Sequence, residues 1–296
     1  MGKCFVVLSS PRNQCATFFR PERPDLYVGY RFIEYQPETL DEPLAGIDAL
    51  PRRRGEEQMP EASEPLTADR ADPWRKGWLA AYDESDADDP VQLRFRSFAD
   101  GSARAAGLDR GGDMEREFFF RPVADGVRMW MRMTARVAVP GACAVQQCLR
   151  FSGETAVAWR QAVARVCPLS EFDHQAHGRP DETLTWARRE GGWLRFPLAM
   201  TRYHTPPGEA LLAEGSAGEV AHGLILRESA DGSCAAGMYW ERTAYLTNRH
   251  PADCLHAVVD FGPLEAGESR TVRGRFFLLE GTKDDLLARW REAFTA

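Results

Sequence analysis

Long apolar runs are missing from this chain of 296 residues. The apolar opening at residues 4–8 is soon followed by Pro11, Arg12 and Asn13, and no later run approaches the length that crosses a bilayer. The opening is also too short for the apolar region of a secretory leader. We therefore expect no membrane partner and a cytoplasmic location.

Paired cysteines are missing as well. The seven cysteines are irregularly spaced, and none belongs to a C-x-x-C pair. An odd count in a chain of this size argues against a disulfide framework. We expect buried thiols in a reducing compartment, in agreement with a cytoplasmic location.

Positive net charge and the common phosphate and nucleophile motifs are also absent. The formal net charge is -7, although arginine greatly outnumbers lysine, and this balance argues against a general nucleic-acid binder. The chain has no glycine-rich phosphate loop and no G-x-S-x-G elbow. We expect neither a cofactor nor a nucleic-acid partner.

What the chain does contain is a strong β pattern within an ordinary globular composition of 44% hydrophobic and 27% charged residues. Period-two alternation over residues 127–137 is its clearest example. One face carries Val127, Met129, Met131, Met133, Ala135 and Val137, and the other carries Arg128, Trp130, Arg132, Thr134 and Arg136. The methionine face indicates core packing, whereas the arginine face indicates either a solvated surface or the floor of a groove.

Strand-like segments bounded by turn residues cover much of the remaining chain. They occur at residues 4–8, 17–19, 26–35, 91–98, 115–121, 145–151, 156–166, 184–188, 193–196, 223–227, 235–246, 255–261 and 269–279, with a hairpin turn at residues 188–192. Between residues 91 and 279 no segment shows helical periodicity with caps. Residues 37–73, rich in Pro, Glu, Asp and Arg, predict a long loop excursion without a core of its own.

Residues 282–295 predict a closing helix. Thr282 can cap this helix, Asp285 follows three residues later, and an apolar face carries Leu286, Leu287, Trp290 and Phe294. We therefore expect residues 1–296 to form a single all-β domain, a large antiparallel β-sandwich with a short C-terminal helix.

A polar cluster accompanies the last three predicted strands. Asn248, Arg249 and His250 precede the strand at residues 255–261, and Glu241 lies one strand earlier. Alternation puts His256, Val258 and Asp260 on one face of the later strand and Leu255, Ala257, Val259 and Phe261 on the other. A face with both His and Asp is unusual in a sandwich core and suits the wall of a polar cleft.

Several segments of the chain resemble known proteins. They are residues 148–159, 169–173, 184–189, 240–242, 254–256, 264–269 and 274–281. They resemble a group of uncharacterised bacterial β-sandwich proteins of carbohydrate-degrading systems, over about half of the chain. The architecture of that group is similar to the supersandwich of galactose mutarotases and of several polysaccharide lyases. The resemblance implies a galactose mutarotase-like supersandwich.

This resemblance implies two sets of acid/base residues. Mutarotase-like enzymes use two His and a Glu, types supplied here by His250, His256 and Glu241. Lyases of uronic acids combine a Tyr or His base with neutralising side chains, types supplied by Tyr203, His204, Arg249, Asn248 and His250. The structural alternatives are an ion pair of Glu241 with an arginine, a hydrogen-bonded and partly buried His256, and an exposed loop at residues 201–205.

Two further groups contain residues of metal-ligand types. The acidic run at residues 83–89 lacks the spacing of a calcium loop, and Asp173, His174 and His177 lack a further ligand at a characteristic spacing. We expect a solvated acidic loop and no metal site.

We predict that the protein binds or acts on a carbohydrate or a sugar acid. Its eight tryptophans favour sugar recognition because apolar sugar faces stack on aromatic rings, although tryptophan also fills cores. The candidate binding residues are Arg249, Asn248, Asp260 and Trp240. A mutarotase-like epimerase, a lyase acting on uronic acids and a non-catalytic carbohydrate-binding or assembly protein all remain open, as does a homo-oligomer.

Overall fold

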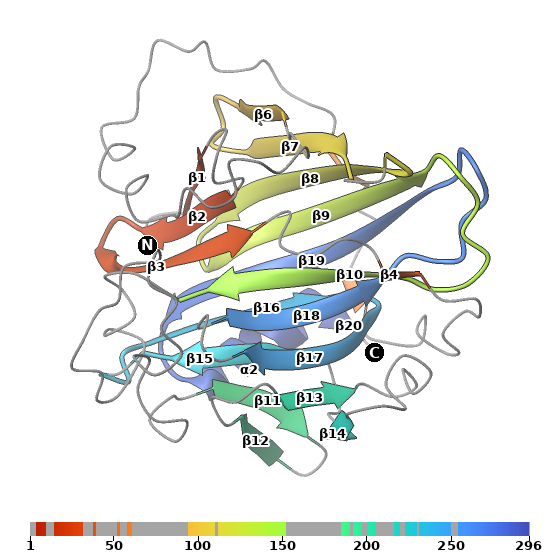
Figure 1. The fold of residues 1–296 in the computed structure, drawn as a ribbon. Helices are drawn as coiled ribbons and strands as arrows, with labels where there is room; N and C mark the ends of the chain where they lie inside the picture. Colours follow the sequence, from red (N-terminus) through yellow and green to blue (C-terminus); the bar gives the residue numbers. More distant parts are fainter. Residues whose placement is uncertain are drawn as a thin grey trace, which may run out of the picture.

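Two largely antiparallel sheets face each other in the computed structural model, and the main hydrophobic core lies between them (Figure 1). The structure describes residues 4–9, 15–31, 38–39, 52–53, 58–60, 94–109, 112–151, 185–189, 192–196, 201–204, 216–219, 223–229, 231–249 and 254–295. Among these residues each of the two sheets has nine strands. The predicted β-sandwich is confirmed.

The first sheet brings together strands that are far apart in the chain. Its order is β1 (Phe5–Ser9), β2 (Cys15–Arg20), β3 (Arg23–Arg31), β10 (Cys143–Arg150), β18 (Cys254–Asp260), β17 (Thr243–Arg249), β13 (Thr201–His204) and β14 (Ser216–Glu219), with β4 (Glu38–Thr39) also paired to β10. The pair β13–β14 is parallel and the other pairs are antiparallel. Residues on β3, β10, β18 and β17 are therefore neighbours in space.

The second sheet is antiparallel throughout its described strands. Its order is β12 (Gly192–Phe196), β11 (Thr185–Arg189), β15 (Ile225–Glu228), β16 (Cys234–Trp240), β19 (Ser269–Glu280), β9 (Gly126–Ala135), β8 (Met114–Val123), β7 (Ala103–Leu108) and β6 (Arg94–Ser97). A separate short pair joins β20 (Phe294–Thr295) to β5 (Arg52–Arg53).

The methionine face of β9 forms part of the core between the sheets. Met129, Met131 and Met133 are all 0% exposed and pack in this core, as the alternation predicts. Val137 departs from the prediction because β9 ends at Ala135, so Val137 lies beyond the strand and is 50% exposed. The core is completed by aromatic residues, among them Phe18 with its ring centroid 4.7 Å from that of Phe276.

The opposite face of β9 is only partly solvated. The alternative of a solvated surface is therefore wrong for Trp130. This side chain is 0% exposed and packs with Phe98, Phe119 and Met59. The guanidinium of Arg121 lies 5.7 Å from the Trp130 ring centroid, within the range of a cation–π contact. Alternation identifies the face of a residue, but it does not reveal which neighbouring strands and segments cover that face.

Residues 235–246, predicted as one strand, are two strands in different sheets. The chain leaves β16 of the second sheet at Trp240, turns through Glu241 and Arg242, and enters β17 of the first sheet. Arg242 adopts a φ of 61°, an uncommon conformation for a residue other than glycine. The β pattern continues through the crossing, so periodicity alone could not detect it.

Other predicted segments have mixed outcomes. The hairpin around residues 188–192 is confirmed by the pairing of β11 with β12. Residues 201–204, which had an exposed loop as their alternative, form β13, and β7 had no predicted counterpart. The strand predicted at residues 156–166 lies outside the described residues. Within residues 37–73, β4 pairs with β10, β5 pairs with β20, and Met59 packs on the Trp130 cluster.

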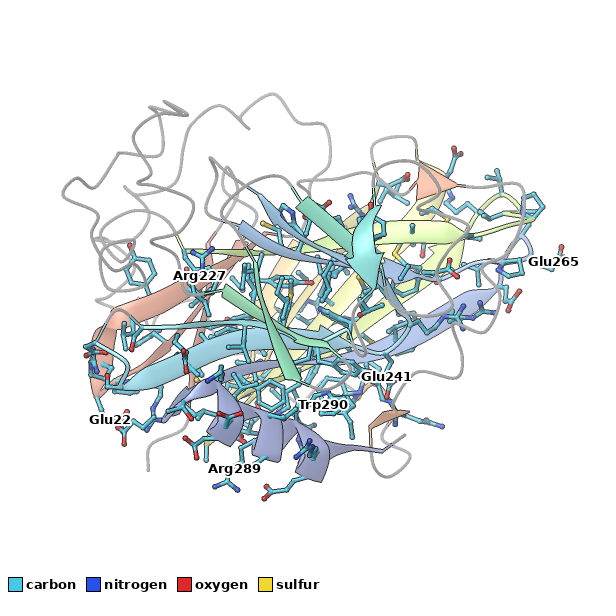
Figure 2. All side chains as sticks on the ribbon, turned by 90° about the horizontal axis from the view of Figure 1, so that it is seen from below. Glu22, Arg227, Glu241, Glu265, Arg289 and Trp290 are labelled. Atoms are coloured by element: carbon cyan, nitrogen blue, oxygen red, sulfur yellow. The ribbon has the colours of Figure 1, made fainter. Side chains whose placement is uncertain are left out.

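The closing helix is confirmed as α2 (Lys283–Ala293). The backbone N–H of Thr282 donates to the Asp285 carboxylate at 2.8 Å, which satisfies one donor at the start of the helix. The predicted apolar face, Leu286, Leu287, Trp290 and Phe294, packs on Leu226, Tyr239 and Phe277 of the second sheet. Figure 2 shows Trp290 between α2 and the sheet and Arg289 pointing away. No helix within the described part of the chain is long and apolar enough to cross a membrane.

Candidate functional site

His256 lies on the outer face of the first sheet, the face directed away from the second sheet. Its neighbours Leu255 and Ala257 point into the core between the sheets, so the predicted alternation of β18 is present. Nδ1 of the His256 ring lies 2.8 Å from Oγ1 of Thr247 on β17. His256 is 1% exposed and Thr247 is 5% exposed, so the pair is shielded from bulk water. Such shielding strengthens the hydrogen bond that holds the ring.

The strand register gathers polar positions around His256. One row runs across five strands of the first sheet and contains Arg31, Cys148, His256, Thr247 and Arg202. The row on one side contains Gln146, Val258, Tyr245 and His204, and the row on the other contains Arg150, Cys254 and Arg249. Directly paired residues share a face of a sheet. We call the positions in these three rows the His256 face.

Asp260, also predicted to bind substrate, stabilises the corner where the chain crosses between sheets. Its carboxylate accepts the backbone N–H of Cys143 at 2.9 Å and that of Gly262 at 3.0 Å. The Arg242 guanidinium donates to the same carboxylate at 3.2 Å and to the Asp260 carbonyl at 2.7 Å. Burial raises the pKa of Asp260, and the N–H donors and Arg242 oppose that rise. The contacts give Asp260 a structural role.

Glu241 lies on the outer face of the second sheet, far from the His256 face. It follows β16 on the same side as Tyr239, which α2 covers, and it is labelled on that side in Figure 2. Its carboxylate pairs with both Nη2 and Nε of Arg273, at 2.9 and 3.1 Å. Trp240, the preceding residue, is 0% exposed in the core between the sheets. Neither residue therefore lies on the His256 face.

The remaining predicted residues divide between the two faces of the first sheet. The register pairs His204 with Tyr245 and Arg249 with Cys254, so these two positions belong to the His256 face. It pairs Tyr203 with Leu246 and Asn248 with Leu255, positions that alternate toward the core. His250 lies outside the described residues. The set proposed for lyase chemistry is therefore not all on one face.

Several residues of the His256 face were absent from the sequence prediction. Thr247, Tyr245, Gln146 and Arg202 reach it through β17, β10 and β13. Alternation could have linked Tyr245 and Thr247 if residues 243–249 had been recognised as a strand of their own. Gln146 and Arg202 depend on which strands become neighbours, and a local pattern does not contain that information.

The thiols and the metal-ligand side chains of the described residues form no further candidate site beside the His256 face. Cys4, Cys143, Cys148 and Cys234 are buried, and burial raises the pKa of Cys4 and of Cys143 to about 12. Among the residues that the structure describes, no three His, Cys, Asp or Glu side chains are grouped so that they could hold a metal ion. The acidic run at residues 83–89 and the residues Asp173, His174 and His177 lie outside this part of the chain.

Comparisons with known proteins leave the family of this chain open. No protein-family model matches the chain, and no curated protein is similar to it. One similar solved structure is that of a candidate aldose 1-epimerase from Escherichia coli K12. The two chains share 14% identity over 64% of this chain and 69% of the other, with a TM-score of 0.34.

Proposed function

We propose that the protein handles a carbohydrate or a sugar acid at the His256 face and performs acid/base chemistry there, as in a mutarotase-like epimerase. The observation that carries this proposal is the buried contact of His256 with Thr247, in a row that continues to Arg202 and lies beside the position of His204. Two histidine positions, a hydroxyl and arginine positions thus share one face. Such groups can exchange protons with a sugar and bind its oxygens.

The Thr247 hydroxyl supports this chemistry by orienting the imidazole. A partner on Nδ1 holds the ring in place, so proton exchange with a substrate would fall to Nε2. Histidine is suited to the task because its ordinary pKa lies close to neutral pH. His256 is thus the residue that we assign to proton transfer.

Anomer interconversion needs two proton transfers, one from the anomeric hydroxyl and one to the ring oxygen. The C1–O5 bond then breaks, the open-chain aldehyde rotates, and reclosure returns both protons. The backbone positions of His204 and His256 lie roughly 12 Å apart. This estimate combines two spacings between neighbouring strands with one step of two residues along a strand. A separation of this size between two backbone positions is compatible with a monosaccharide of one ring bound between them.

One observation favours a second candidate, a carbohydrate-binding protein without turnover. Mutarotase-like chemistry pairs histidines with a glutamate, and the sandwich separates Glu241 from His256. A lyase acting on uronic acids is a further alternative, in which Arg249 or Arg202 would neutralise the carboxylate. These candidates share the same face and differ in what happens to the bound sugar.

Nuclear magnetic resonance of freshly dissolved α-D-glucose, α-D-galactose and α-D-galacturonate tests the proposal. We expect the wild-type protein to speed equilibration of the anomers for at least one sugar, and His256→Ala to abolish that increase. Titration calorimetry with the same sugars identifies a binder without turnover, and ultraviolet absorbance of an unsaturated product from oligogalacturonate identifies a lyase. Failure to bind or convert any of these sugars would overturn the proposal.

A further inference from the structure

Two adjacent glutamines of β10 have opposite environments. Gln147 faces the core, where its amide oxygen accepts the Tyr30 hydroxyl and its amide nitrogen donates to the Val145 carbonyl at 3.2 Å. Gln146 alternates to the His256 face, opposite Val258. Within the described part of the chain its Nε2 is buried and has no hydrogen-bond partner, although the residue as a whole is half-buried.

A buried amide donor without an acceptor destabilises the folded protein. Such a group lacks, in the folded protein, the hydrogen bonds that water gives it in the unfolded chain. Buried polar groups are nearly always satisfied in native proteins, so an unsatisfied one requires a physical explanation, such as an ordered water, a bound ligand or a functional role. For Gln146 a bound ligand is the explanation that we favour. Its amide donor is buried, and the residue lies in the row next to His256 on the proposed site.

We infer that Gln146 is a sugar-binding residue and that its amide N–H donates to an acceptor oxygen of the carbohydrate. This inference rests on the proposed function of the His256 face. The acceptor is a hydroxyl or ring oxygen of a neutral sugar, or the carboxylate of a sugar acid. Gln146 and His256 are diagonal neighbours on paired strands, with Cα atoms about 7–8 Å apart. Gln146 therefore positions the sugar, and proton transfer remains with His256.

The matched variants Gln146→Leu and Gln147→Leu test this assignment, with thermal melting and titration calorimetry as readouts. The calorimetric probes are D-galactose and D-galacturonate, measured with the full-length chain. We expect Gln146→Leu to melt at the wild-type temperature or slightly above it, because the substitution removes an unsatisfied donor. The same variant should bind sugar about tenfold more weakly. Gln147→Leu should melt roughly 2–6 °C lower, because the Tyr30 hydroxyl loses its hydrogen bond to the Gln147 amide oxygen, and should keep the affinity of the folded protein.

A second substitution, Gln146→Glu, keeps the shape of the side chain but replaces the donor by a carboxylate. A loss of affinity confined to D-galacturonate would identify the acceptor as the sugar carboxylate, and equal losses for both sugars would identify a hydroxyl or ring oxygen. Either pattern supports the inference.

Two results would overturn the role of Gln146 alone. One is unchanged sugar affinity in Gln146→Leu while the wild type binds, and the other is a fall in melting temperature as large as that of Gln147→Leu, which would reveal a protein partner. If the wild type binds neither sugar and none of those used to test the proposed function, the function of the face is itself refuted and this inference fails with it.

Discussion

Arg242 and Asp260 form a buried ion pair at the corner where the chain passes from one sheet to the other. Nη2 of Arg242 lies 3.2 Å from Oδ2 of Asp260, and both side chains are 5% exposed or less. The pair connects the start of β17 to the end of β18. The sheet crossing at residues 241–242 therefore depends on a charge interaction between two strands of the first sheet.

Loss of this pair should strongly destabilise the fold. Asp260→Ala removes the carboxylate that pairs with the buried Arg242 charge and accepts two backbone N–H groups, so we expect a loss of about 3–5 kcal/mol in the free energy of unfolding. Urea denaturation measures the change. Glu292→Ala is the control, because its ion pair with Arg289 is exposed and should contribute almost nothing. Similar midpoints for the two variants would contradict this account.

Thr247 and Thr134 provide a matched test of the His256 face. Thr247→Val removes the hydroxyl that contacts His256, whereas Thr134→Val removes one that contacts Ser269 at 2.7 Å on the outer face of the second sheet. We expect Thr247→Val to slow sugar conversion about tenfold, since one lost hydrogen bond of about 1–1.5 kcal/mol changes a rate by roughly that factor. Thr134→Val should leave the rate unchanged. Equal rates for both variants would remove Thr247 from the site.

Met131 and Val137 test the limits of the methionine face. Met131→Ala should lower the free energy of unfolding by about 2–5 kcal/mol because it leaves a cavity in the core between the sheets. Val137→Ala should change it by about 0.5 kcal/mol or less, because this exposed side chain lies beyond the end of β9. Chemical denaturation of the two variants measures both values. A large effect at Val137 would mean that the alternation continues past Ala135.

Asp231 should make stability depend on acidic pH. Hydrogen bonds from Ser229 and then from Ser233 lower its pKa, with a smaller contribution from Arg23. The folded state therefore holds fewer protons than the unfolded state below the ordinary value of 3.8, and stability from this group is present above that pH and is lost below it.

The measurement compares melting temperatures of the wild type and Asp231→Asn at about pH 7 and about pH 2.5. We expect the wild type to melt at a higher temperature than Asp231→Asn at about pH 7. The difference in melting temperature between the two proteins should shrink at about pH 2.5. A difference that stays constant between the two conditions would show that the Asp231 charge does not contribute.

The amino-acid sequence by itself determined the fold class and several of the local elements. Alternation over residues 127–137 identified Met129, Met131 and Met133 as core residues, because side chains of a strand point to opposite faces. The helix α2 was equally predictable, since Thr282, Asp285 and the apolar residues at helical spacing lie within a few turns of one another. These features depend on neighbours in the chain.

Only the tertiary structure decided which polar residues share a surface. Glu241 and His256 are close in sequence, yet the crossing at Arg242 places them on opposite outer faces of the sandwich. Gln146 and Thr247 are far apart in sequence, yet both flank β18. The physical reason is that strand pairing and sheet membership depend on long-range hydrogen bonds, which the period-two pattern of a single strand does not specify.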